Sequence, residues 1–467
     1  MSSMADFTQS VRKVCTSAEA FVARNEKWLV PAILVGFLLV CLWVINNNGW
    51  CGQDFNFHLY YTQQLFRNPY DWVYLDTTSR PLYCWIGLAC FKLEPGASGF
   101  RLVSILFSIS GAAALFLMHT ASRRFIRSPL LRCSALTLIA SLPVTVITTV
   151  VYAEDTVTLF PFVLGCWSLV KALESTFHWK ALCYAALTGL TLTIGCFGKA
   201  TFAILPLAVL AAVAIFFLWR KITMRRVVFI VLLSSLAPAL VGAWLAIKSK
   251  KELHDVSFNH SFDWHGTGEM TWRSILFPYP ADARIFSAPG YWDKDPDGSL
   301  PLLKNNSYSY PALLHLAIFT DLMGFANIDR HARGACRPEP QKTEARLAVC
   351  SGLFFSLPTV AAVLAFSIQL GWACIRRNPP PKPSLVVWLL FALFWYVPLV
   401  TILPYVLNAF YWGFWLPRLV LPALWCFFLM LFAAVDALPP RWSRPLAGIL
   451  ALSVAIQTSF DITSIQF

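Results

Sequence analysis

The stretch WLVPAILVGFLLVCLWVI, residues 28–45, has no charged side chain and decides the fold class. An α-helix needs about 20 mostly apolar residues to cross the hydrocarbon core of a bilayer, so this stretch predicts a transmembrane helix. The whole chain of 467 residues is 57% hydrophobic and 13% charged, and its mean hydropathy is +0.60. Soluble domains carry about 25% charged residues. The chain is therefore predicted to be a membrane protein.

Other stretches along the chain have the same length and character, and together they predict an all-α polytopic membrane protein with about eleven transmembrane helices. The predicted segments are 27–46, 100–121, 130–149, 155–174, 180–197, 201–219, 226–247, 347–373, 385–405, 416–436 and 443–460.

The basic residues are distributed unevenly between the two sides that these segments define. Nineteen Lys and Arg residues fall in or next to segments on the side of the N-terminus. The short segments on the opposite side, apart from the apolar stretch 81–93 and the long segment 248–346, carry Arg67, Arg80, Lys199 and Arg418. Cytoplasmic loops carry the excess of Lys and Arg, so we expect a cytoplasmic N-terminus. Most of the net charge of +13 then reflects topology and not nucleic-acid binding.

The apolar stretch PLYCWIGLACFKL, residues 81–93, is too short to cross a bilayer. If it did cross, the basic segment RRFIRSPLLR would lie outside, against the charge distribution. We therefore predict an interfacial or re-entrant helix on the outer face.

Acidic residues collect on the predicted outer face. Asp54 lies in QDFNFHLYYTQQL just after the first segment, and Glu154 and Asp155 lie in YAEDT. Asp54 is either a helix N-cap or a functional carboxylate. The Glu154–Asp155 pair either stabilises a helix N-terminus or binds a sugar hydroxyl or a cation.

Two basic residues lie where charge is costly. Lys199 stands between two apolar segments, directly before a helix predicted to begin near Thr201. It either extends its ammonium to the membrane interface or forms an anion site beside the helix N-terminus. Arg418 lies within an apolar run, and arginines at such depth usually face a cavity or a partner.

The sequence contains no convincing metal site. Asp54 and His58 are four residues apart and share a helical face, but a third ligand is missing. His254, His260 and His265 are spaced too loosely for zinc. We predict no cofactor, and a divalent metal ion lacks support.

Several short motifs occur in the order found in one known family. They are QDFNFHLYYTQQL, SRPLYCWIGLACFKL, FRLVSILFSISG, the ED pair, the GK pair that ends at Lys199, and PRLVLPAL. In these motifs the chain resembles GT-C membrane glycosyltransferases, in particular the protein O-mannosyltransferase and aminoarabinose lipid A transferase branch. The resemblance covers residues 27–220 and 385–436. It departs where Phe55 replaces a second carboxylate and where Pro81 stands without a second proline.

We predict three parts in the chain, of which residues 248–346 match nothing in the family. Residues 1–247 would form an N-terminal GT-C-like membrane module with its catalytic first outer loop at 47–99. Residues 248–346 would form an extracytoplasmic loop or lid region, and residues 347–467 the C-terminal transmembrane helices.

The resemblance implies transfer of a sugar from a polyprenyl-phosphate donor to an acceptor hydroxyl of a glycan, lipid or protein. The reaction would invert the sugar and take place on the extracytoplasmic face of a bacterial cell membrane. Asp54 would be the general base, because a carboxylate within hydrogen-bond reach can take the acceptor proton. The expected donor-phosphate ligands are Lys199, Arg418 and Arg80, and the expected sugar or acceptor contacts are Glu154, Asp155, His58 and Tyr60.

Other classes of membrane protein use the same substrates. A transporter or flippase of lipid-linked sugars would show internal repeats and interrupted helices, and the sequence shows no repeat. An oligosaccharide ligase or polymerase would transfer whole glycans from a lipid carrier. A scaffold without enzymatic activity would not need Arg418.

Overall fold

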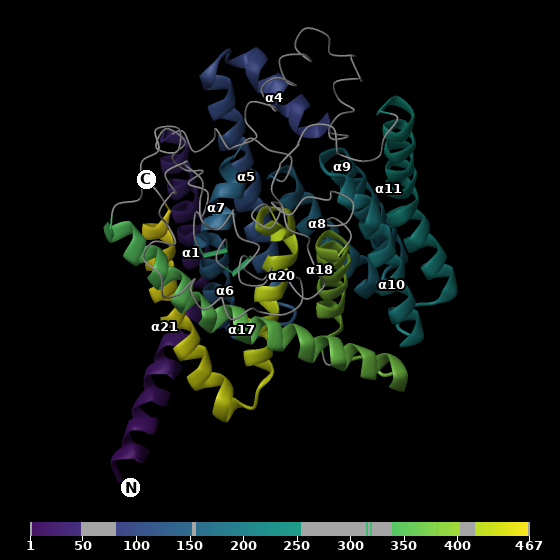
Figure 1. The fold of residues 1–467 in the computed structure, drawn as a ribbon. Helices are drawn as coiled ribbons and strands as arrows, with labels where there is room; N and C mark the ends of the chain where they lie inside the picture. Colours follow the sequence, from purple (N-terminus) through teal and green to yellow (C-terminus); the bar gives the residue numbers. More distant parts are fainter. Residues whose placement is uncertain are drawn as a thin grey trace.

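The computed structural model describes residues 2–47, 81–151, 156–253, 314–315, 318–319, 339–380, 382–401 and 416–465. These residues form helices and no strand (Figure 1). The helices are α1 (Ser2–Asn46), α4 (Pro81–Leu93), α5 (Ala97–Ser122), α6 (Pro129–Ser141), α7 (Pro143–Val150), η1 (Thr156–Thr158), α8 (Leu159–Glu174), α9 (His178–Gly198), η2 (Ala200–Ile204), α10 (Leu205–Leu218), α11 (Met224–Leu253), α17 (Glu339–Arg376), α18 (Pro383–Thr401), α20 (Leu416–Ala437) and α21 (Pro440–Ser464).

Within the described ranges, nine helices are long and apolar enough to cross a membrane. The bent pair α6–α7 and the shorter apolar helix α18 account for the two remaining predicted segments. The order of helices follows the order of predicted segments throughout. The prediction of an all-α polytopic membrane protein is confirmed.

The short helix α4 has the bounds predicted for it, Pro81–Leu93. Its 13 residues extend about 20 Å at 1.5 Å per residue, less than the hydrocarbon thickness. It lies across one end of the bundle, next to the start of α5 (Figure 1). Its placement at the membrane surface stays a prediction.

The segment predicted as one helix over 130–149 is broken. Helices α6 and α7 meet at Leu142 with a bend of 58°. Pro143 begins α7; it has no N–H to donate, and its ring disfavours a continuous helix through the preceding turn. At the break the Leu138 carbonyl accepts the Leu142 N–H at 3.1 Å and the Ser141 hydroxyl at 3.0 Å. Apolar periodicity alone did not indicate this interruption.

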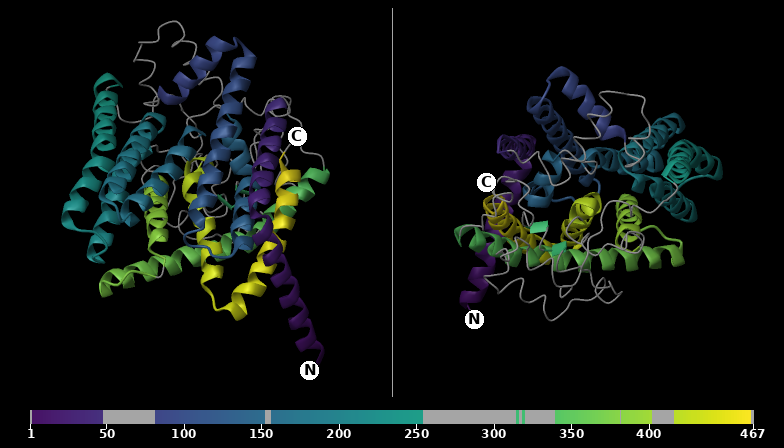
Figure 2. Two further views of the ribbon diagram at one scale, coloured as in Figure 1. Left: turned by 180° about the vertical axis from the view of Figure 1, so that it is seen from behind. Right: turned by 45° about the horizontal axis from the view of Figure 1, so that its top comes forward.

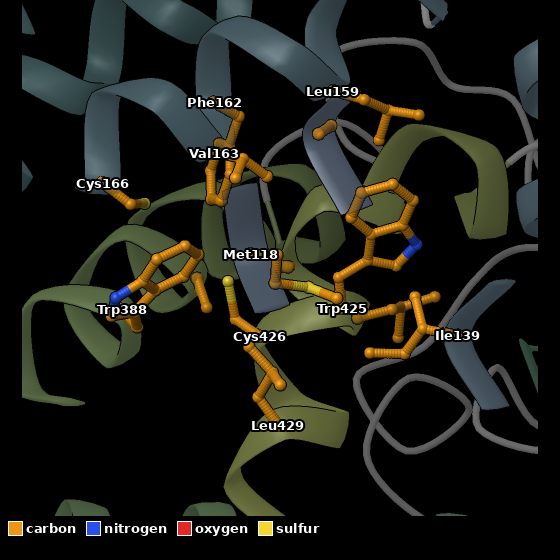
Figure 3. Close-up of a cluster of buried hydrophobic side chains, with 14 of the residues drawn as sticks. Met118, Ile139, Leu159, Phe162, Val163, Cys166, Trp388, Trp425, Cys426 and Leu429 are labelled. Carbon is orange, nitrogen blue, oxygen red and sulfur yellow. The ribbon is translucent and has the colours of Figure 1, made fainter. Parts of the chain in front are cut away.

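The core lies where α8, α18 and α20 meet α5 and α6. Figure 3 shows Phe162 and Cys166 of α8 near Trp388 of α18 and near Trp425 and Cys426 of α20. All five side chains are fully buried, and Trp425 Nε1 donates to Thr145 Oγ1 in α7 at 3.1 Å. The buried indole N–H therefore has a partner, as a polar group in an apolar core requires.

The N-terminus of α1 projects from one end of the bundle, and the connections α10–α11, α17–α18 and α20–α21 lie towards the same end (Figures 1 and 2). This end carries the basic segments, and we refer to it as the basic end. It also carries acidic partners that the count of Lys and Arg left out.

At the basic end, Glu26 of α1 forms an ion pair with Arg132 of α6 through two contacts of 3.0 and 2.9 Å. His119 Nε2 of α5 lies 3.1 Å from the same carboxylate, and Arg132 also donates to the carbonyls of Ile126 and Arg127. Glu26 and Arg132 are largely withdrawn from solvent, with side chains 14% and 9% exposed. The cluster joins α1 to the consecutive helices α5 and α6, which lie far from it in sequence.

Replacing Arg132 with Met should leave Glu26 in the interior without its two-contact partner. Breaking a buried ion pair from one side costs about 3–5 kcal/mol, whereas replacing both members is often nearly neutral. We therefore expect Arg132→Met to lower the free energy of unfolding in detergent markedly, and Glu26→Gln/Arg132→Met to recover most of the loss. Equal destabilisation of the single and double variants would show that the pair is not coupled.

Candidate functional site

Only two of the predicted site residues lie within the described ranges. Lys199 is described in full, and Arg418 lies in the first turn of α20 with its side chain outside the described part. The remaining predicted site residues lie outside the described ranges, and their roles stay predictions: Asp54, His58, Tyr60, Arg80, Glu154 and Asp155.

Lys199 occupies a break between two helices. Helix α9 ends at Gly198, Lys199 adopts an extended conformation with φ −158° and ψ 131°, and η2 begins at Ala200. The backbone of Lys199 is satisfied on both sides, because its N–H donates to Gly195 O at 2.8 Å and its carbonyl accepts from Phe202 N at 3.1 Å. The side chain is only 3% exposed. The break therefore places the Lys199 side chain inside the protein. Of the two alternatives predicted for this lysine, the ammonium that extends to the membrane surface does not fit this burial.

One aromatic ring lies beside the Lys199 ammonium and packs against two others. Its Nζ lies 6.0 Å from the centroid of Trp395 on α18. Trp395 packs edge-on against Phe202 of η2 and Phe162 of α8, with centroid distances of 5.0 and 5.3 Å. A cation over an indole ring gains about 0.5–2 kcal/mol, more when both are withdrawn from water. We call Lys199, Trp395, Phe202 and Phe162 the lysine–aromatic cluster.

The same break lies beside the ends of two other predicted site segments. A Cβ placed on Gly198 would lie 2.9 Å from Val157 Cγ2 and 3.6 Å from Leu82 Cδ2. Val157 is two residues beyond Asp155, and Leu82 is two residues beyond Arg80. Trp85 of α4 also packs against Phe197, with centroids 6.1 Å apart. The fold thus brings the continuation of the Arg80 segment and of the Glu154–Asp155 segment to Lys199.

Buried hydroxyls hold the start of the 3-10 helix η1 in place. Thr156 Oγ1 lies 2.6 Å from Thr148 O and 2.9 Å from Val151 O, both at the end of α7. Thr149 Oγ1 in turn contacts Cys41 Sγ of α1 at 3.6 Å. The two residues that flank 152–155, Val151 and Thr156, are each 2% exposed. The chain therefore enters and leaves the Glu154–Asp155 segment from the protein interior.

A second polar cluster was missed by the sequence analysis. Asp461 of α21 is fully buried, and its Oδ1 accepts a hydrogen bond from Gln457 Nε2 at 2.7 Å. Gln457 Oε1 accepts from Ser351 Oγ of α17. Asp461 lies one residue beyond the predicted segment 443–460, so it looked like a surface residue. Its position directly after an apolar segment was the sequence feature that could have indicated a buried carboxylate.

Among the described residues, no group of three or more His, Cys, Asp or Glu side chains could hold a metal ion. The chemistry that this part of the chain offers is an ammonium in an apolar, aromatic surrounding. In such a surrounding a fixed cation stabilises negative charge more strongly than it does in water.

No protein-family model and no curated protein matches the sequence. Among solved structures, the oligosaccharyltransferase of Archaeoglobus fulgidus in its apo form is similar to this chain, with a TM-score of 0.48 and 14% identity. The similarity covers 94% of this chain and 56% of the archaeal chain, so this chain spans little more than half of that protein. Similar folds can carry different chemistry, so this likeness assigns no activity.

The close contact at Gly198 can be tested with one methyl group. Gly198→Ala should force the stiff Val157 side chain to move, which typically costs about 1–3 kcal/mol. Gly371→Ala in α17 is the matched control, because a Cβ there meets nothing within 4 Å and alanine favours the helix. We expect thermal unfolding in detergent to shift down for Gly198→Ala alone. A Gly198→Ala protein as stable as Gly371→Ala would contradict this packing.

Proposed function

We propose that this protein is a membrane glycosyltransferase that transfers a sugar from a polyprenyl-phosphate donor to an acceptor hydroxyl on the side opposite the basic end. The acceptor is a glycan, a lipid or a protein. The observation that carries the proposal is the burial of Lys199 at a helix break, next to the ends of two segments whose motifs resemble glycosyltransferases.

The donor requires two different surroundings, and the protein offers both. The polyprenyl tail can lie against apolar helix faces, and the phosphate needs fixed positive charge where water is scarce. Lys199 provides that charge, with Arg80 and Arg418 assigned to the same phosphate by their motifs. Buried Trp395 and Phe202 limit water around the ammonium.

The proposed reaction is a single displacement. The acceptor oxygen attacks the anomeric carbon while Asp54 takes the hydroxyl proton. The bond between the anomeric carbon and the phosphate oxygen breaks, and its electron pair leaves with the lipid phosphate. Lys199 stabilises the charge that grows on that oxygen, and the configuration at the anomeric carbon inverts. In this scheme Glu154, Asp155, His58 and Tyr60 hold the sugar or the acceptor.

One structural feature favours a second candidate function. The α6–α7 break is a bent, buried interruption of the kind that transporters use at their substrate sites. A flippase would move the lipid-linked sugar intact, whereas a transferase or ligase releases the lipid carrier. Measuring free polyprenyl phosphate and intact donor in the same proteoliposomes separates these functions.

Lys199→Met should weaken use of the donor. The substitution keeps the length of the side chain and removes its charge, so we expect the rate of polyprenyl-phosphate release from labelled donor to fall at least tenfold at low donor concentration. Lys180→Met is the control, because Lys180 is an exposed lysine near the start of α9, the helix that ends just before Lys199. If both variants release lipid phosphate at the wild-type rate, Lys199 is not a donor ligand.

Asp54→Asn should abolish proton abstraction while preserving shape. Loss of a general base typically lowers turnover by about 10²–10⁴-fold, so we expect a drop in that range with donor binding retained. Single-turnover transfer and donor binding measured on the same preparation separate the two effects. Near-wild-type turnover would place the base elsewhere, with Glu154 and Asp155 tested next.

A further inference from the structure

A cavity of about 230 Å³ lies at the basic end, where α17, the connection to α18, and the end of α20 meet. None of its lining residues belongs to the lysine–aromatic cluster, since its walls come from the end of α17 and the beginning of α18, and Trp395 lies further along α18. Phe366, Gln369, Leu370, Pro380, Lys382, Leu385, Val386, Leu389 and Ala437 line it.

The side chains that line this cavity are mostly apolar and could contact a hydrocarbon chain. The lining is mostly apolar, and Gln369 and Lys382 are its polar side chains. An apolar cavity of roughly 150 Å³ can stay dry and accept an apolar guest, because bound water needs several polar partners. A larger cavity with walls of Phe, Leu and Val therefore favours part of an acyl chain over ordered water.

Next to the cavity, α17 exposes apolar side chains, which would face lipid if this helix spans the membrane. Ile368 and Ile375 are 73% and 76% exposed, and Trp372 is 54% exposed. Arg376 stacks on the Trp372 ring, with its guanidinium carbon 4.3 Å from the centroid. A tryptophan paired with an arginine at the end of an apolar helix is typical of the headgroup level of a bilayer. The cavity thus lies next to the headgroup level, where the acyl chains of a lipid begin.

Three basic residues lie at this end of α17, close to the cavity. Lys382 lines the cavity, and Arg376 and Arg377 end α17 as exposed side chains. The Lys382 ammonium lies 2.9 Å from Asp436 Oδ2, and the Asp436 carboxylate also accepts from the backbone N–H groups of Arg127 and Ser128 at 3.1 and 3.0 Å. An ammonium has three donors, so the bond to Asp436 leaves Lys382 able to reach a phosphate as well.

We propose that this cavity binds one anionic phospholipid from the leaflet at the basic end. One acyl chain occupies the space between Phe366, Leu370 and Leu389, and the phosphate lies between Lys382 and the pair Arg376–Arg377. A zwitterionic lipid offers the same chain without net negative charge, so the basic residues favour the anionic one. Each basic residue near an anionic headgroup contributes about fivefold in affinity.

Native mass spectrometry of the purified full-length protein tests this proposal, with phosphatidylglycerol and phosphatidylcholine titrated in parallel. The wild type should retain one phosphatidylglycerol at concentrations where phosphatidylcholine dissociates. Gln369→Trp should fill the mouth of the cavity and remove that lipid, whereas Leu364→Trp, at a 58% exposed position of the same helix outside the cavity, should not. Lys382→Gln should weaken phosphatidylglycerol about fivefold and leave phosphatidylcholine unchanged.

Val386→Phe, which fills the cavity from α18, gives an independent test, and thermal unfolding in detergent identifies variants that stay folded. Equal retention of both lipids by the wild type would overturn the proposal. Undiminished phosphatidylglycerol binding by a folded Gln369→Trp or Val386→Phe protein would overturn it too.

Discussion

Every backbone N–H and C=O group within a bilayer must find its partner inside the protein, and the described part of this structure follows from that requirement. Long helices satisfy it along most of the chain. Where a helix ends in the interior, side-chain hydroxyls and adjacent backbone groups take over. Leu142 N and Ser141 both donate to the Leu138 carbonyl at the α6–α7 break, Thr156 donates to carbonyls at the end of α7, and the carbonyl of Lys199 accepts from Phe202 at the third break. Each of these three interruptions therefore has such partners.

Two of these interruptions lie next to each other, and this determines where chemistry can take place. The α7–η1 junction and the α9–η2 junction touch through Val157 and Gly198, and α4 covers them through Leu82. Only glycine at position 198 allows this approach, since a methyl group there would enter the Val157 side chain. The contact brings a buried lysine next to the ends of two segments rich in charged and aromatic residues. Irregular backbone within a membrane protein is tolerated when it is buried or lines a cavity, and both junctions are buried here.

Hydropathy and length predicted the helices well, because the cost of leaving polar groups in lipid fixes both quantities. The same argument predicted α4 as a short helix, since 13 residues cannot span a bilayer. It did not predict the α6–α7 break, because both halves lie within one predicted apolar segment, 130–149. Pro143 gave no clear signal either: α1, α11, α17, α18, α20 and α21 each contain an internal proline and continue through it. Glu26 and Asp436 were missed because the topology rule counts only Lys and Arg. Trp395 and Phe162 were missed because nothing in an apolar segment marks which ring will meet a distant lysine.

The basic residues of this protein differ in role according to what surrounds them. Arg132 has a carboxylate and two carbonyls within hydrogen-bond distance, so its charge and donors are used to join α1, α5 and α6. Arg226 similarly donates to the carbonyls of Ala172 and Ser175 at the end of α8, where a cation also opposes the negative end of the helix dipole. Lys199 instead lies against an indole ring, which attracts a cation without neutralising it. The sequence showed that all three positions are basic, but only their surroundings distinguish arginines that bond to backbone carbonyls from a buried lysine beside an indole ring.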